Sequence, residues 1–142
     1  TLLNGKYRIE KVLGQGGFGI TYLATQTVLG NKVAIKELFM QGINDRHDGM
    51  VTVSNNANSN LFTHQKRKFV KEAQRIAGLN NKHIVKVYNM IEENNTAYYV
   101  MDYIDDESLQ DVITHHHEAL PESCVKDYLS QILSALSAIH QQ

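Results

Sequence analysis

The chain has 142 residues, 42% of them hydrophobic, and a formal net charge of −1. This length suits one domain, or one domain and part of another, and the apolar content excludes a disordered chain. The balanced charge gives no reason to expect nucleic acid or an anionic membrane as a partner. The one cysteine, Cys124, cannot form an internal disulfide, so we expect a reducing, cytoplasmic location.

No apolar run approaches the roughly 18 residues of a membrane-spanning helix. The first residues also lack the features of a signal peptide. We therefore expect no membrane contact in this segment. The sequence begins with Thr1 and not with Met, which indicates an excerpt of a longer protein.

The first predicted element is a hairpin with a glycine-rich loop. Residues 7–13 alternate between apolar and polar side chains, and residues 20–25 are rich in β-branched and aromatic ones. Both patterns predict strands. The loop contains Gly14, Gly16 and Gly19, a spacing that lets backbone N–H groups approach a phosphate chain without a Cβ in the way. The same pattern in an NAD-binding domain opens a helix, whereas here a strand follows, which argues against that class.

Residues 32–38 predict a third strand, which carries Lys36. Side chains alternate along a strand, so Lys36 shares one face with Ala34, while Glu37 lies on the opposite face. A lysine at the end of a buried strand supplies a fixed positive charge for phosphates. The alternative is a surface lysine whose stem lies along apolar residues.

Residues 39–60 are interpreted as an insertion before the next helix, with a docking or regulatory element as the alternative reading. Within it, Asp48-Gly49 between β-prone arms predicts a hairpin. The polar residues 54–60 predict a mobile loop.

A helix is predicted over residues 62–79, because apolar residues recur at helical spacing. Glu72 borders this apolar stripe, and an inward carboxylate needs a positive partner, for which Lys36 fits. The alternative is a solvent-exposed pair with Lys68 or Arg75. The basic residues of this helix lie mostly off the stripe and are interpreted as a solvated face. They are Lys66, Arg67, Lys68, Lys71 and Arg75.

Residues 84–91 and 97–103 predict two more strands, and a short helix is expected from Ser108. The loop His115-His116-His117-Glu118 gives no metal site, because adjacent residues cannot all point to one ion. Pro121 is expected in the first turn of a last helix. Its apolar stripe consists of Leu129, Ile132, Leu133, Leu136 and Ile139.

The glycine hairpin followed by Val33-Ala34-Ile35-Lys36 resembles the opening of a eukaryotic-type Ser/Thr protein kinase, and bacterial members most of all. The resemblance implies an α+β fold: a kinase small lobe with a five-stranded antiparallel sheet and one main helix, then two helices of an incomplete large lobe. It places the small lobe at residues 1–103 and the hinge with the first large-lobe helices at 104–142.

The resemblance also implies an ATP site, with Lys36 on the α- and β-phosphates and Glu72 as its partner; these two are the candidate catalytic residues. Met101 would take the gatekeeper position, and the backbones of Asp102 and Ile104 would bind the adenine edge. A valine is usual in the family where this chain has Thr21. The other expected ATP contacts are Leu13, Gly14, Gln15, Gly16, Gly17, Phe18, Gly19, Thr21 and Ala34.

The sequence contains neither the His-Arg-Asp-x-x-x-x-Asn loop, nor Asp-Phe-Gly, nor Ala-Pro-Glu. The residues that hold Mg²⁺ in the family are therefore expected outside this chain, and no metal ligand is assigned within it. We expect a parent protein that transfers the γ-phosphate of ATP to protein hydroxyls, and an inactive fragment. The alternative is a pseudokinase or scaffold module. We further expect self-association through the exposed stripe of the last helix.

Overall fold

A computed structural model of the chain describes residues 1–105, 114 and 121–141. The chain divides into two compact units, one of residues 1–78 and 86–103, the other of residues 79–85 and 104–142. Among the described residues, no helix is both long and apolar enough to cross a membrane.

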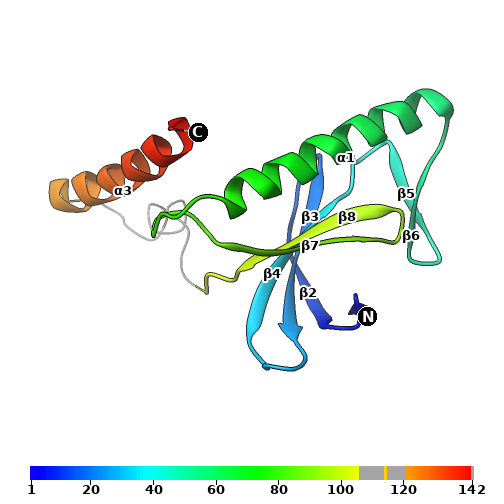
Figure 1. Cartoon of the computed structure of the whole chain (residues 1–142), viewed down its shortest axis with the longest axis horizontal. Helices are drawn as coiled ribbons and strands as arrows, with labels where there is room; N and C mark the ends of the chain where they lie inside the picture. Colours follow the sequence, from blue (N-terminus) through cyan, green and yellow to red (C-terminus); the bar gives the residue numbers. More distant parts are fainter. Residues whose placement is uncertain (106–113, 115–120, 142) are drawn as a thin grey trace. The chain divides into compact units, whose positions relative to one another are not determined.

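The first unit is built on a six-stranded antiparallel sheet in the order β1-β2-β3-β4-β8-β7 (Figure 1). Five of its strands and the α+β class agree with the prediction, while the two-residue strand β1 was not predicted. The strands are β1 (Leu2–Leu3), β2 (Tyr7–Gln15), β3 (Gly19–Gln26), β4 (Lys32–Leu38), β7 (Val87–Glu93) and β8 (Thr96–Asp102).

The alternation of side chains divides the core between the two faces of this sheet. Ile35 and Val100 lie in one buried cluster together with Tyr7 and Leu3. Tyr99, next to Val100 on β8, belongs to the other cluster, which α1 covers. Lys36 pairs with Tyr99 across the ladder, so the lysine emerges on the face that α1 covers.

The helix α1 spans Asn56–Ala77 and begins earlier than predicted. The predicted loop over residues 54–60 is therefore wrong in most of its length. Asn55 caps the helix, because its side chain accepts a hydrogen bond from the backbone N–H of Asn58 at 2.8 Å. Phe62, which is buried against the sheet, anchors the first turns. A stretch rich in Asn and Ser therefore supplied a helix cap.

The Asp-Gly hairpin is confirmed. Strands β5 (Asn44–His47) and β6 (Met50–Val53) pair in an antiparallel ribbon. Asp48 and Gly49, in the turn, both have positive φ, of 49° and 82°. The backbone N–H of Val51 donates to the carbonyl of Asn94 in the β7–β8 turn at 2.8 Å, so the hairpin is bound to the main sheet.

In the second unit, α3 spans Glu122–His140, with Pro121 just before it at the cap position. The amide of Asn81 donates to the backbone carbonyl of Ser134 on α3 at 3.2 Å, which ties the segment after α1 into this unit. The expected helix from Ser108 and the loop of histidines lie outside the described residues.

Candidate functional site

The glycine loop is the tip of the β2–β3 hairpin. The backbone N–H of Gly16 donates to the carbonyl of Gly19 at 2.9 Å and closes the loop. A Cβ on Gly16 or Gly17 would meet nothing within 4 Å, as would one on Gly14. A Cβ on Gly19 would lie 2.8 Å from the carbonyl oxygen of Glu37, so only glycine fits there. The loop is thus open on one side and in contact with β4 at its last glycine.

The tip of the loop is bound to the chain that follows β4. Phe39 and Gln41 donate backbone hydrogen bonds to the carbonyls of Phe18 and Gly17, at 3.1 and 3.0 Å. The ring of Phe18 remains 63% exposed. Two carbonyls of the loop therefore accept hydrogen bonds from the protein itself, and the ring of Phe18 projects into solvent.

Lys36 lies against this loop. Its Cε and Cγ atoms are 3.6 and 3.8 Å from the position that a Cβ on Gly19 would take. Its Nζ atom lies 3.5 Å from Oε1 of Glu72 on α1, with the two side chains 35% and 50% exposed. The structure therefore brings Gly19, Lys36 and Glu72 together from three elements.

Tyr99 completes the environment of this ion pair. The sequence placed it on a strand and did not predict it as a residue of the site. Its hydroxyl donates to Oε1 of Glu72 at 3.2 Å, and the Lys36 ammonium lies 5.6 Å from the centroid of its ring. The ring packs on Phe69 of α1 at a centroid distance of 4.9 Å. Tyr99 therefore connects the sheet, the helix and the charged pair.

The electrostatics keep the Lys36 ammonium in its charged form. Partial burial by itself disfavours the Lys36 ammonium, but Tyr99 and Glu72 outweigh it and raise the pKa of Lys36 above its ordinary value. Burial also raises the pKa of the Tyr99 hydroxyl, although Lys36 opposes that shift. At neutral pH the site thus offers a cation beside a neutral phenol that donates.

The predicted adenine-binding residues lie along β2, β3, β4 and β8. Ala34 is buried and pairs with Met101 on β8 and with Leu23 on β3. Thr21 pairs with both Gly14 and Lys36.

Gln15, at the end of β2, pairs with Ile20, and Leu13 on the same strand is 40% exposed. These placements put the predicted contacts from β2, β3, β4 and β8 on neighbouring strands of one sheet.

At the end of β8, the carboxylate of Asp102 accepts hydrogen bonds from the Lys86 backbone N–H at 3.0 Å and from the Tyr88 hydroxyl. The Asp102 side chain thus serves the strand pairing, and the Asp102 backbone N–H donates to the carbonyl of Lys86 at 3.0 Å. Ile104 begins the second unit and is 62% exposed, so its role remains a prediction.

A second charged cluster lies on the opposite face of β4, and the sequence did not reveal it. The carboxylate of Glu37 is 1% exposed and accepts from both Tyr22, at 2.6 Å, and Tyr98, at 3.0 Å. Arg46 of β5 donates to both carboxylate oxygens at 2.8 Å. The available signal was that Glu37 shares its strand face with buried Ile35, so a partner had to exist.

Within the described ranges, no group of three or more His, Cys, Asp or Glu residues is arranged to hold a metal ion.

The sequence matches the family described as the protein kinase domain over residues 7–142. The chain belongs to this family. It is 34% identical to serine/threonine-protein kinase PrkC of Bacillus subtilis over 139 residues, which are 98% of this chain and 19% of the relative. It is 30% identical to serine/threonine-protein kinase pkn2 of Myxococcus xanthus over 141 residues, which are 99% of this chain and 15% of the relative.

A solved structure described as the apo form of PpkA-294 matches with a TM-score of 0.80 and 25% identity. The match covers 86% of this chain and 44% of that chain. The chain thus has the fold of a kinase domain and spans less than a fifth of the length of these two curated relatives.

Proposed function

We propose that this chain is the ATP-binding part of a serine/threonine protein kinase, whose parent protein transfers the γ-phosphate of ATP to protein hydroxyls. The observation that carries the proposal is the ion pair of Lys36 with Glu72 at 3.5 Å, beside the last glycine of the loop. Membership in the protein kinase family supports it.

The residues of the chain fit a triphosphate. The loop has no side chains at Gly14, Gly16 and Gly17, so its backbone can approach phosphate oxygens closely. Lys36 supplies a charge that Glu72 and Tyr99 orient. ATP supplies the phosphoryl group, and these residues bind it and neutralise its charge. The family uses Mg²⁺ as well, and no metal ligand is assigned within the described residues.

Nucleotide binding to the Lys36→Ala variant tests this proposal. Loss of a charge-assisted contact to phosphate should weaken ATP binding by at least about tenfold. Lys32→Ala is a matched control, because Lys32 lies on the same strand and pairs with Glu10 at 2.6 Å. Binding should be measured by isothermal titration with the 142-residue chain. Equal affinities of the wild type and Lys36→Ala would overturn the proposed site.

We also propose that the 142-residue chain transfers no phosphate by itself, because its sequence lacks the loop that supplies the base for the substrate hydroxyl. Phosphorylation of a generic protein substrate by the purified chain would contradict this. A scaffold that binds partners without nucleotide has no need of the Lys36–Glu72 pair, and it would show no ATP binding in the same titration.

A further part of the proposal concerns assembly. The apolar stripe of α3, from Leu129 to Ile139, is exposed in the structure. A second copy of the chain offers an identical stripe, and pairing the two would remove apolar surface from water. We therefore propose that the fragment self-associates through α3.

A further inference from the structure

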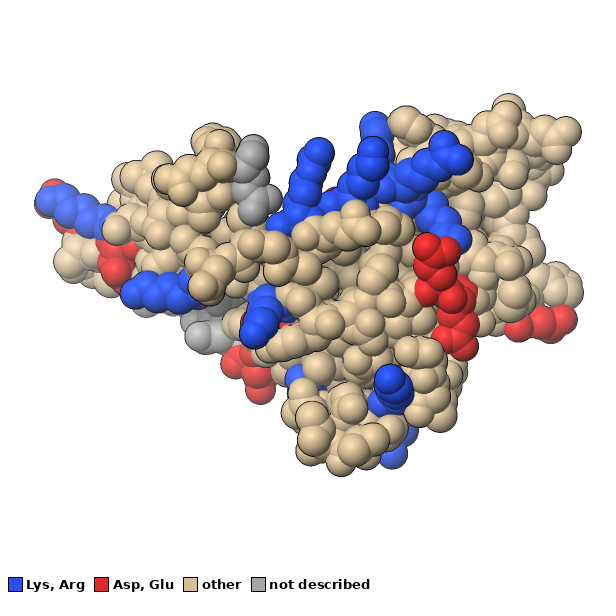
Figure 2. All heavy atoms as spheres, viewed as in Figure 1, with Lys and Arg blue, Asp and Glu red and all other residues tan. Residues whose placement is uncertain are grey.

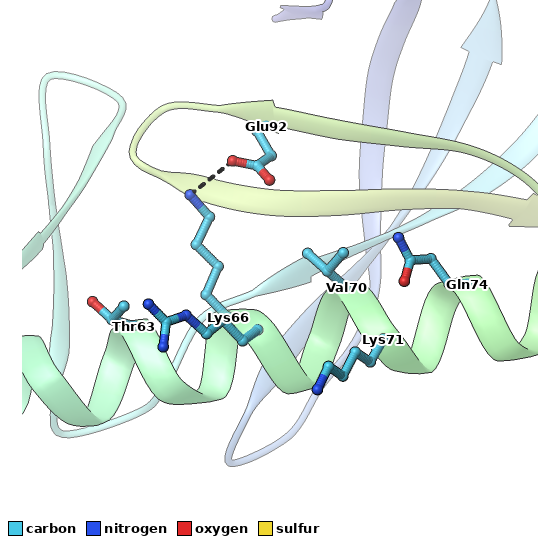
Figure 3. Close-up of a pocket in the computed structure, with 7 residues that line it drawn as sticks. Thr63, Lys66, Val70, Lys71, Gln74 and Glu92 are labelled. Atoms are coloured by element: carbon cyan, nitrogen blue, oxygen red, sulfur yellow. Dashed lines mark ion pairs between the residues drawn. The ribbon is translucent and has the colours of Figure 1, made fainter.

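An open groove of about 410 Å³ lies between α1 and β7 (Figure 3). Its lining includes three basic residues of α1, Lys66, Arg67 and Lys71, and the apolar Val70. Glu92 of β7 forms the opposite rim and pairs with Lys66 at 3.2 Å. None of these residues belongs to the nucleotide site.

The groove and the nucleotide site use different sides of α1. Val70 and Glu72 are two positions apart, which places them about 200° apart around the helix axis. Glu72 faces Lys36, whereas Val70 packs on the edge of the core cluster and lines the groove. A ligand in the groove would therefore not compete with a nucleotide for the same side chains.

The charge of α1 is predominantly positive. The helix carries five Lys or Arg residues and a single acidic residue, Glu72. Figure 2 shows basic side chains gathered along this helix. Lys66 is neutralised by Glu92, but Arg67 and Lys71 form no ion pair within the part of the chain that the structure describes. The groove thus presents two uncompensated cations beside an apolar surface.

We propose that this groove binds an acidic peptide segment of a protein partner, with an apolar side chain on Val70 and carboxylates on Arg67 and Lys71. Charge complementarity selects the acidic segment, and Val70 gives it an apolar anchor. Glu92 at the rim and the net charge of −1 disfavour a long polyanion such as nucleic acid, which needs a broad basic face. This interaction goes beyond the proposed phosphoryl transfer.

The test uses a short fluorescein-labelled peptide of glutamates around one leucine, titrated with the 142-residue chain by fluorescence anisotropy. The double variant Arg67→Glu/Lys71→Glu should weaken binding by at least about tenfold. Lys68→Glu/Arg75→Glu is the matched control, with the same change in charge on exposed positions of the same helix that do not line the groove. It should change binding by no more than about twofold.

Replacing the leucine of the peptide by serine should also weaken binding, because the contact with Val70 would be lost. Unchanged ATP binding by both double variants would show that they are folded. The proposal is overturned if the wild type does not bind the peptide, or if both double variants weaken binding equally. It is likewise overturned if oligothymidine or a phosphatidylserine vesicle binds more tightly than the peptide at the same salt concentration.

Discussion

Gly19 is the residue at which the glycine loop meets β4. A Cβ there would lie 2.8 Å from the carbonyl oxygen of Glu37, which is sheet backbone and cannot move without disturbing the ladder. We expect Gly19→Ala to lower the free energy of unfolding by about 1–3 kcal/mol. Gly17→Ala is the control for stability, because its Cβ would meet nothing within 4 Å. Urea unfolding of both variants measures the difference, and equal stabilities would refute the assigned contact.

At the residue scale, the sequence predicted the contact between Lys36 and Glu72, which the structure shows at 3.5 Å. Lys36 could be placed because it follows a strand pattern, and Glu72 because it borders a helical stripe. Glu37 could be assigned to a face but not to a partner, since Arg46 lies on β5, whose position relative to β4 no periodicity predicts. Tyr99 was read as part of a strand, and its hydroxyl contact with Glu72 depends on the docking of α1.

Among the elements, the β5–β6 hairpin is bound to the main sheet through one arginine. Arg46 is the only basic residue that pairs with buried Glu37 among the described residues, and it comes from β5. Burial alone would lower the pKa of the Arg46 guanidinium, but Glu37 outweighs this and raises it, so the guanidinium stays charged. Arg46 thus reaches the face of the sheet opposite the Lys36 site, whereas Val51 of β6 packs in the cluster that α1 covers.

We therefore expect Arg46→Met to destabilise the chain by about 2–3 kcal/mol, because it leaves a buried carboxylate with only phenol partners. His47→Ala, on the same strand, is the control, since the His47 side chain is 81% exposed. Thermal unfolding followed by circular dichroism gives both values. The double variant Glu37→Gln/Arg46→Met should recover part of the loss. An Arg46→Met chain as stable as the wild type would remove this account of the hairpin.

The elements themselves were predicted with unequal success for physical reasons. Strands β2, β3, β4, β7 and β8 have apolar patterns that persist along their length, and they were found. The start of α1 was missed because residues 56–61 carry no buried side chain, and their helical state depends on the Asn55 cap and on Phe62. A polar composition alone could not distinguish a capped helix from a loop.

For the whole molecule, the sequence was sufficient to predict the family and the class of fold, because the glycine hairpin and the lysine-bearing strand belong to the protein-kinase signature set. The family match over residues 7–142 and the fold match confirm both predictions. It was not sufficient to predict how charged side chains are grouped on the surface. The basic residues of α1 read as one solvated face, but two of them, Lys68 and Arg75, lie outside the groove that the other three line. Such a division requires the position of β7 next to the helix.

The apolar stripe of α3 is the surface through which we expect two copies of the chain to associate. Leu129, Ile132, Leu133, Leu136 and Ile139 are each 43–55% exposed. If two copies pair through this stripe, Leu133→Glu should introduce two facing carboxylates into the contact and separate the copies. Ser130→Glu adds the same charge outside the stripe and should leave the association unchanged. Light scattering over a concentration series measures the mass, and a wild-type chain that stays monomeric at high concentration would contradict the pairing.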